Sequence, residues 1–329
     1  MYIANTRRYQ RIEYRRCGRS GLLLPEISLG IWHNWGLYSS FEEMKDMIFT
    51  AFDNGITHID AANNYGPPPG SAEENLGRIL SDELRHYRDE LVISTKAGHE
   101  MWPGPYGNWG SRKYLIASCD QSLKRMGLEY VDVFYHHRPD PDTPLEETMS
   151  ALADIVKQGK ALYVGFSRYP SDLLRKAVKI LEEDYHIHPV LNQVRYNLLD
   201  RHTEDDGLYE TLSDVGMSAS IYSPLAQGLL TDKYLQGDIP EVSRARENRF
   251  LKEEMLTETL VAKLNVLNDM ALSRDMKLSE MAIAYLLRRP EIATVIVGAR
   301  NKEQLLRNIK ALEKSRSFTP DELEEIDTI

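Results

Sequence analysis

The sequence predicts an α/β fold, a (β/α)8 barrel of the TIM type with an N-terminal β-hairpin and long loops at the C-terminal mouth. Short apolar segments of strand length alternate with amphipathic segments of helical period, which is typical of parallel strands joined by helices. Eight such units occur, the number that closes a barrel. The rival fold is a doubly wound open sheet. It usually carries a Gly-x-Gly-x-x-Gly loop after its first strand, and Leu29-Gly30-Ile31-Trp32 offers none.

The strands can be placed in order along the chain. Tyr14–Arg16 and Leu22–Leu24 flank a turn that contains Gly18 and Gly21, which predicts a hairpin before the barrel. The barrel strands are predicted at Ile27–Ile31, Thr57–Ile59, Leu91–Thr95, Val131–Tyr135, Ala161–Phe166, Val190–Val194, Ser218–Tyr222 and Thr294–Val297. The intervening segments are therefore the helices that cover the barrel.

Two of these helices begin with what resembles a capping box. Ser71 precedes Glu74 by three residues, and Thr143 precedes Glu146 by the same spacing. In such a box the hydroxyl side chain accepts a hydrogen bond from the first turn, and the glutamate bonds back to the cap residue. We therefore expect Ser71 and Thr143 to cap their helices.

Two long loops are expected to shape the mouth of the barrel. Ala226–Met255 is the longest irregular stretch, and long loops in compact domains tend to be functional. It is basic in its middle, where we expect Arg246 and Arg249 to be solvated. Gly98–Gly110 is rich in Gly, Pro and aromatic residues and could form a second wall of the mouth.

The composition of the chain limits which classes of function are possible. The 329 residues are expected to form a single domain, 1–329, and the hydrophobic fraction of 42% is ordinary for a globular protein. A net charge of −10 argues against nucleic-acid binding, so any anionic ligand must be met by local Lys or Arg. Cys17 and Cys119 fit two reduced thiols, and no apolar run approaches 18 residues. We expect a cytoplasmic protein with no membrane segment.

Reactive side chains gather after two consecutive strands. Asp60 ends the second predicted strand, Lys96 ends the third, and Tyr65 lies on the loop between them. A lysine cation next to a phenol favours the phenolate and lowers its pKa, and a change of roughly 3 pH units in that pKa corresponds to about 4 kcal/mol. Taken alone, the Asp could be a turn cap, and the Lys could form a Schiff base or a structural ion pair.

Other polar side chains also follow strands, and the C-terminal strand ends of a barrel surround one mouth. This set comprises His136 or His137, Ser167, Gln193, Tyr222 and Gly298. Adjacent residues of a strand face opposite sides, so only one of the two histidines can face the mouth. No metal site is predicted, and we interpret His186 and His188 as surface residues.

The motifs resemble those of the aldo-keto reductase superfamily along nearly the whole chain. They are Ile59-Asp60-Ala61-Ala62-Asn63-Asn64-Tyr65-Gly66, Thr95-Lys96, Asp132 to Pro139, Gly165-Phe166-Ser167, Asn192-Gln193, Tyr222 to Gly228, and Gly298 to Asn308. Within the superfamily the chain is similar to bacterial reductases of L-glyceraldehyde 3-phosphate and methylglyoxal, and to β subunits of voltage-gated potassium channels.

The resemblance implies roles for individual residues. Tyr65 would donate a proton to the substrate carbonyl, Lys96 would lower the Tyr65 pKa, Asp60 would pair with Lys96, and His137 would orient the carbonyl. The substrate pocket would contain Trp32, His33, Tyr65, Trp102 and His137. The residues expected to bind the cofactor are Trp32, Asp60, Ser167, Gln193, Tyr222, Ser223, Leu225, Gly228, Lys233, Arg244, Gly298, Arg300, Gln304 and Asn308.

Two positions depart from the channel-subunit pattern. Arg300 and Arg307 stand where that pattern has Ser and Glu, and a guanidinium pairs well with phosphate. The implied cofactor is therefore NADPH (NADP+), although loss of the Glu puts one adenine contact in doubt. Arg138 could meet a substrate phosphate or a neighbouring carboxylate, and we favour the carboxylate.

The implied function is NADPH-dependent reduction of small aldehydes, such as L-glyceraldehyde 3-phosphate or methylglyoxal, by a homo-oligomer that is a tetramer or larger. The main alternative is an NADP-binding regulatory subunit of an ion-channel-like partner with little turnover. His137 favours the enzyme, because the channel subunits typically have Asn there. A lysine aldolase, with an imine on Lys96, is a third hypothesis.

Overall fold

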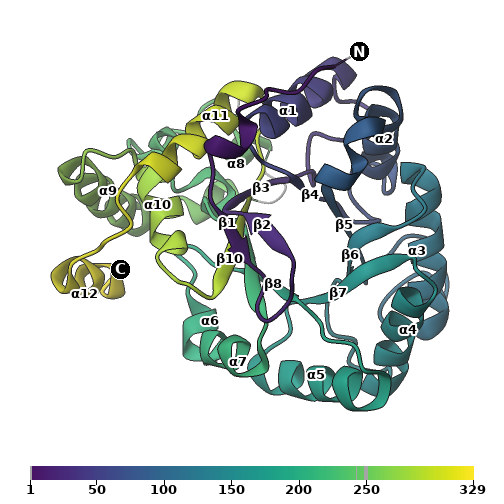
Figure 1. Ribbon diagram of the computed structural model, residues 1–329. Coiled ribbons are helices and arrows are strands. Elements are labelled where there is room, and N and C mark those ends of the chain that lie inside the picture. Colours follow the sequence, from purple (N-terminus) through teal and green to yellow (C-terminus); the bar gives the residue numbers. More distant parts are fainter. Residues whose placement is uncertain (1, 242, 248–250) are drawn as a thin grey trace.

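The computed structural model describes residues 2–241, 243–247 and 251–329. In this part of the chain, eight parallel strands close into a barrel in the order β10-β3-β4-β5-β6-β7-β8-β9, which confirms the predicted fold (Figure 1). The barrel strands are β3 (Ile27–Gly30), β4 (His58–Asp60), β5 (Val92–Ala97), β6 (Val131–His136), β7 (Ala161–Ser167), β8 (Leu191–Arg195), β9 (Ser218–Tyr222) and β10 (Ile292–Val297).

The predicted hairpin is confirmed and closes one end of the barrel. β1 (Tyr14–Arg16) pairs antiparallel with β2 (Leu23–Pro25), and the pair lies across the barrel in Figure 1. Its turn contacts the segment that enters β9, because the Gly18 amide donates to Ser218 Oγ at 2.9 Å. Leu24 is buried against side chains from inside the barrel. Since strands enter the barrel at this end, the opposite, C-terminal end is left as the mouth.

Helices surround the barrel (Figure 1). They are α1 (Phe41–Asp53), α2 (Ser71–Ile79), α3 (Arg112–Met126), α4 (Leu145–Lys157), α5 (Ser171–Tyr185), α6 (His202–Asp205), α7 (Leu208–Val215), α8 (Arg244–Glu247), α9 (Glu258–Ser273), α10 (Leu278–Leu287), α11 (Lys302–Lys310) and α12 (Pro320–Asp327). The side chains of Ser40, Ser111 and Thr257 accept hydrogen bonds from the first turns of α1, α3 and α9, which fixes those starts.

The two predicted capping boxes are wrong. Ser71 is the first residue of α2, and its hydroxyl donates to the Pro68 carbonyl oxygen instead of capping the helix. The residue before it is Gly70, whose φ of 91° suits a residue without a side chain. Thr143 stands too far from α4, which begins at Leu145. Its amide is held by Asp140 Oδ1 at 3.2 Å, so a turn precedes the helix.

Side chains alternate between the two faces along each strand, and this alternation decides which of them face the barrel interior. On β4 and β5, Ile59 and Ile93 point outward into the core between barrel and helices. Asp60, Ser94 and Lys96 bond one another inside the barrel. Strand alternation therefore places a charged and polar cluster below the mouth.

The long loop at 226–255 is only partly irregular. It contains short helical turns at Ala226–Gly228, Asp232–Tyr234 and Glu253–Met255 together with α8, and Arg249 lies outside the described residues. Cys17 and Cys119 are free and buried. Within the described residues there is no helix long and apolar enough to cross a membrane, nor any group of three metal-ligating side chains.

Candidate active site

A cavity of about 860 Å³ opens at the C-terminal ends of the barrel strands. Every residue predicted to bind the cofactor lines it, and so do four of the five predicted substrate-pocket residues. The lining includes Trp32, His33, Asp60, Tyr65, His137, Ser167, Gln193, Tyr222, Ser223, Leu225, Gly228, Lys233, Arg244, Gly298, Arg300, Gln304 and Asn308. The fold thus brings together residues that are spread over nearly 280 positions of the sequence, as the barrel argument predicts.

Asp60, Lys96 and Tyr65 form one hydrogen-bonded group at the bottom of this cavity. Lys96 Nζ donates to Asp60 Oδ2 at 2.7 Å and to the Ala61 carbonyl oxygen at 2.5 Å. It also lies 3.4 Å from the Tyr65 hydroxyl. The Lys96 side chain is fully buried, so the ion pair with Asp60 holds the ammonium where water does not reach. Of these three residues, Tyr65 and Asp60 line the cavity and Lys96 lies behind them.

The predicted lowering of the Tyr65 pKa is wrong, because the pKa is raised overall. Burial raises the pKa of Tyr65 well above its ordinary value of about 10, and Asp60 and Tyr222 raise it further, while Arg168 lowers it. Burial also lowers the pKa of Lys96, against the opposing effect of Asp60. The physical reason is desolvation, because a phenolate in this place would have lost its water. Tyr65 therefore holds its proton at neutral pH.

His137, and not His136, faces the cavity, as predicted. The Tyr65 and His137 rings lie 5.9 Å apart, whereas His136 ends β6 and bonds the Tyr169 hydroxyl through Nδ1 at 2.7 Å. Burial lowers the pKa of His137 well below 6.5, and the charge of Lys96 lowers it further. His137 is therefore neutral near pH 7. A neutral imidazole can donate a hydrogen bond to a carbonyl without giving up its proton.

Trp102 and Arg138, which were considered as contacts to the substrate, lie outside the set of residues that line the cavity in the described part of the chain. Trp102 packs on Tyr114, with ring centroids 5.3 Å apart, and is not among the described residues that line the cavity. Arg138 donates to the Gly98 carbonyl oxygen at 2.8 Å and lies over the Trp109 ring. It contacts neither the cavity nor a carboxylate in the described hydrogen bonds, so its favoured role as a carboxylate partner is wrong. Instead it fixes the loop 98–110.

The middle of the cavity has the amide and aromatic groups expected for a nicotinamide. Ser167 Oγ donates to the Gln193 backbone oxygen at 2.9 Å, which ties the ends of β7 and β8 together. Gln193 Nε2 donates to Asp60 Oδ1 at 3.1 Å and so lies next to the reactive group. Tyr222 ends β9 and presents its ring to the cavity.

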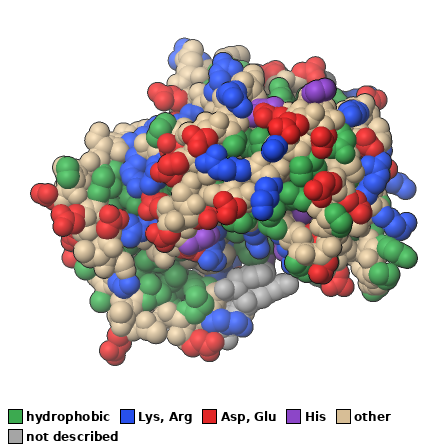
Figure 2. All heavy atoms as spheres, turned by 90° about the horizontal axis from the view of Figure 1, so that it is seen from below, with side chains coloured by type: hydrophobic (Ala, Val, Ile, Leu, Met, Phe, Trp, Pro, Cys, Tyr) green, Lys and Arg blue, Asp and Glu red, His purple; other side chains and the backbone are tan. Residues whose placement is uncertain are grey.

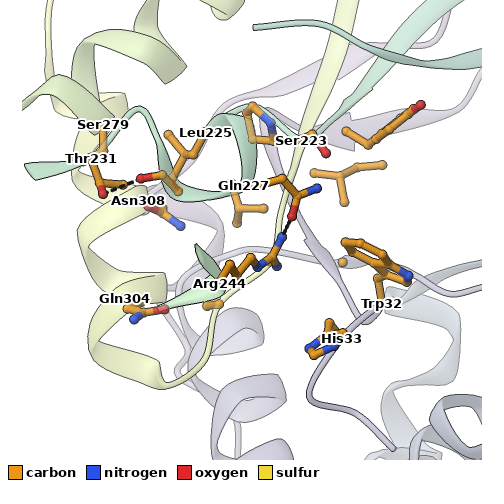
Figure 3. Close-up of a pocket in the computed structure, with 18 of the residues that line it drawn as sticks. Trp32, His33, Ser223, Leu225, Gln227, Thr231, Arg244, Ser279, Gln304 and Asn308 are labelled. Carbon is orange, nitrogen blue, oxygen red and sulfur yellow. Dashed lines mark hydrogen bonds between the residues drawn. The ribbon is translucent and has the colours of Figure 1, made fainter. Parts of the chain in front are cut away.

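The far end of the cavity is cationic. Burial lowers the pKa of Lys233, and Arg300, Arg307 and Arg244 lower it further against the opposing charge of Asp232. In Figure 3, Arg244 reaches between Gln304 on one side and Trp32 on the other and bonds the Gln227 side chain. Like charges held this close repel one another, and a bound phosphate would relieve the repulsion. The donor set therefore fits the phosphates of a dinucleotide.

The overall charge of the chain does not supply that positive potential. The chain carries a net charge of −10, and on the face in Figure 2 acidic and basic side chains are interspersed.

Arg300, one of the cations of the cavity, forms an ion pair, because its Nη2 lies 2.6 Å from Glu247 Oε1 on α8. This ion pair connects the segment that precedes α11 to the long loop 226–255 at the cavity.

Sequence reasoning missed three residues that line the cavity near Tyr65. Arg168 follows β7 with a φ of +61°, and its guanidinium lies over the Tyr222 ring. His99 lies 4.5 Å from the His137 ring, and Asn64 neighbours Tyr65. The signal for Arg168 was its place directly after Ser167, at the end of a barrel strand. His99 gave a weaker signal because it lies three residues beyond Lys96.

Comparison with known proteins gives a consistent result. A sequence model described as "Aldo/keto reductase family" matches residues 26–329. The chain is 52% identical to L-glyceraldehyde 3-phosphate reductase of Escherichia coli strain K12, over 99% of this chain and 95% of that protein.

Two further relatives are more distant. A probable voltage-gated potassium channel subunit beta of Oryza sativa subsp. japonica is 34% identical, over 97% of this chain and 96% of that protein. Among solved structures, a thermostable aldo-keto reductase in complex with the inhibitor epalrestat superimposes with a TM-score of 0.74. It is 30% identical and the match covers 96% of this chain and 99% of that one.

Proposed function

Because this chain belongs to the aldo/keto reductase family, we propose that it is an NADPH-dependent reductase of small aldehydes in which Tyr65 is the proton donor. The observation that carries the proposal is a single cavity with two different ends. One end holds Asp60, Lys96 and Tyr65 in hydrogen-bonded contact, and the other end is lined by cations suited to phosphate.

Tyr65 supplies the proton. Its raised pKa keeps the phenol protonated, which is the state that a donor needs before the reaction. A bound nicotinamide supplies the hydride, and the carbonyl oxygen then gains negative charge next to the phenol. Lys96 Nζ, already 3.4 Å from the phenol oxygen, stabilises the phenolate as the proton leaves. Asp60 keeps that ammonium in position throughout.

His137 orients the substrate and does not supply the proton. Its lowered pKa makes it a neutral hydrogen-bond donor, so it can polarise a carbonyl while Tyr65 performs the transfer. With Tyr65 it forms two donors on one side of the cavity, their rings 5.9 Å apart. This geometry suits a single carbonyl oxygen.

The proposed cofactor is NADPH. Lys233, Arg244, Arg300 and Arg307 form the cationic end, which is more positive charge than a pyrophosphate alone needs. A 2′-phosphate would compete with Glu247 for Arg300. Charge-assisted bonds to phosphate then favour NADPH over NADH.

The proposed substrates are short aldehydes, with L-glyceraldehyde 3-phosphate first and methylglyoxal second. The similar Escherichia coli protein is named for the phosphorylated triose. In this chain, Arg168 is the cation that could receive the substrate phosphate, because it lies at the mouth beside His99 and Tyr222. Methylglyoxal carries no such anion and would not use Arg168.

The test is a screen of phosphorylated and unphosphorylated aldehydes with NADPH, followed by the loss of reduced-nicotinamide absorbance. Tyr65→Phe should lower kcat by roughly 10²- to 10⁴-fold, the usual contribution of a positioned proton donor. Its NADPH affinity, measured by cofactor fluorescence, should stay near that of the unchanged protein. An unimpaired rate in Tyr65→Phe would remove Tyr65 from the proposal.

The regulatory-subunit hypothesis has one observation in its favour, the likeness to a probable channel subunit at 34% identity. Against it stands His137, which faces Tyr65 in the cavity. Rapid multiple turnover in the aldehyde screen would decide for the enzyme, and a stable NADP complex without turnover would decide for the subunit. A homo-oligomer, tetramer or larger, stays a prediction that light scattering can test.

A further inference from the structure

A second polar group lies inside the barrel, directly below Asp60. His58 is fully buried on β4, with Nδ1 2.8 Å from Ser28 Oγ and Nε2 2.9 Å from Ser94 Oγ. Ser28 Oγ lies 2.6 Å from Thr294 Oγ1, and Ser94 Oγ donates to Asp60 Oδ1 at 2.7 Å. Five side chains from β10, β3, β4 and β5 thus form one continuous series of hydrogen bonds.

The direction of these bonds can be deduced step by step. Asp60 as a carboxylate only accepts, so the single hydroxyl proton of Ser94 goes to Asp60. Ser94 Oγ must then accept from His58, which places the imidazole proton on Nε2. In a neutral ring, Nδ1 is then the acceptor, so Ser28 donates to His58 and Thr294 donates to Ser28. All four bonds point toward Asp60.

The neutrality of His58 follows from its surroundings. Burial lowers the pKa of His58 to about 4, and the charged groups that face it, Asp60 and Lys96, act in opposite senses. Its other neighbours in the series are uncharged hydroxyls. At neutral pH the ring therefore carries one proton and has one donor and one acceptor.

We propose that His58 is a positioning residue for the reductase reaction: through Ser94 it fixes the Asp60 carboxylate so that the Asp60 oxygen Oδ2 faces Lys96. Ser94 and Gln193 both donate to Oδ1, which leaves Oδ2 for the ammonium at 2.7 Å. Aligned donors polarise one another and strengthen the last bond to the carboxylate. His58 thus acts on Tyr65 through three intermediaries, and this consequence rests on the proposed function.

The first test measures the imidazole itself and needs no activity. In ¹⁵N NMR of the full chain, the His58 signals, assigned by their loss in His58→Gln, should show a protonated Nε2 and an unprotonated Nδ1 near neutral pH. The opposite tautomer, or a doubly protonated ring, would overturn the deduced direction. This result is independent of whether the protein reduces aldehydes.

The second test measures catalysis in matched variants. His58→Leu removes both bonds and should lower kcat by about tenfold to a hundredfold, the usual effect of a slightly misplaced reacting group, with little change in KM for NADPH. His58→Gln keeps an acceptor and a donor and should recover most of the rate. Ser218→Ala is the control, because it removes a buried strand serine that bonds Gly18 at the closed end of the barrel.

The outcomes separate the two proposals. A folded His58→Leu variant with unchanged kcat, or a His58→Gln variant as slow as His58→Leu, would overturn the positioning role. If His58→Leu does not fold, Ser28→Ala keeps the imidazole but removes the donor to Nδ1 and the acceptor for Thr294, and it should lower kcat severalfold and move the His58 signals. Unchanged values in Ser28→Ala would equally overturn it. An unmodified protein without any reductase activity would instead refute the proposed function and leave the tautomer test standing.

Discussion

The buried ion pair permits a prediction that separates stability from catalysis. Lys96→Met removes the ammonium and leaves the Asp60 oxygen Oδ2 without the donor that held it at 2.7 Å. Asp60 is only 2% exposed, so water does not replace that donor, while Ser94 and Gln193 still bond Oδ1. Removing one partner of a buried pair typically costs about 3–5 kcal/mol. We expect a loss of that size in the free energy of unfolding, measured by urea denaturation with an unchanged m-value.

The matched control is the double variant Lys96→Met with Asp60→Asn. An amide at 60 keeps an oxygen where Ser94 and Gln193 donate, and no charge is left unpaired. Replacing both charges is often neutral for stability, so the double variant should unfold within about 1 kcal/mol of the original protein. Both variants should nevertheless lack aldehyde reduction. If Lys96→Met alone unfolds at the original urea concentration, the pair is not a desolvated charge pair and the electrostatic argument fails.

Three further predictions concern charged and titratable side chains. Arg168→Gln should raise KM for L-glyceraldehyde 3-phosphate about tenfold and leave KM for methylglyoxal unchanged, since only the former carries a phosphate; equal effects on both would place the phosphate elsewhere. Arg300→Ser should weaken NADPH about tenfold in fluorescence titrations and spare NADH; equal losses would refute the assignment. His58 and His136 have pKa values lowered to about 4, so the stability they contribute is fully present above pH ~6.5. As the pH falls from there toward ~4, each of them should cost the folded state about 1.4 kcal/mol per pH unit, because the unfolded chain binds the proton first. Denaturant midpoints that stay constant over this range would contradict it.

Much of the fold could be predicted because its signals are local and repeated. Each barrel strand is a short apolar run, and the end of each run marks the mouth, so Asp60, Lys96 and Gln193 could be placed together before any coordinates. The choice of His137 over His136 followed from strand alternation with the family motif. The helix starts at Ser71 and Thr143 were mispredicted because Gly70 and Asp140 determine the local turns, and spacing alone does not reveal such turns.

Contacts made by loops could not be predicted in the same way. Trp102 and Arg138 were assigned by residue type, but loop residues are positioned by partners that are distant in sequence or by backbone oxygens. Arg168 and His99 were missed because their places after Ser167 and Lys96 do not show that their side chains approach His137 in the folded chain. The series of hydrogen bonds through His58 could not be predicted from the sequence either, because it joins β10 to β3, the strands that close the barrel.

The direction in which the Tyr65 pKa moves follows from how deeply the side chain is buried, and the sequence alone does not reveal this burial. In bulk water, a lysine about 4 Å from a phenolate stabilises it by about 1 kcal/mol, and there is no cost of desolvation; in the protein interior this coupling grows severalfold, but so does the cost of burying the charge. At Tyr65 the cost of burying the phenolate is the largest effect, so the pKa of Tyr65 is raised. The Lys96 charge, 3.4 Å from the Tyr65 hydroxyl, offsets part of that cost for the phenolate that forms during proton transfer. Because Asp60 has already fixed Lys96, no reorganisation is required at that moment. Burial therefore makes Tyr65 a weaker acid that keeps its proton until the substrate oxygen gains charge, and the fixed Lys96 limits the cost of the phenolate left behind.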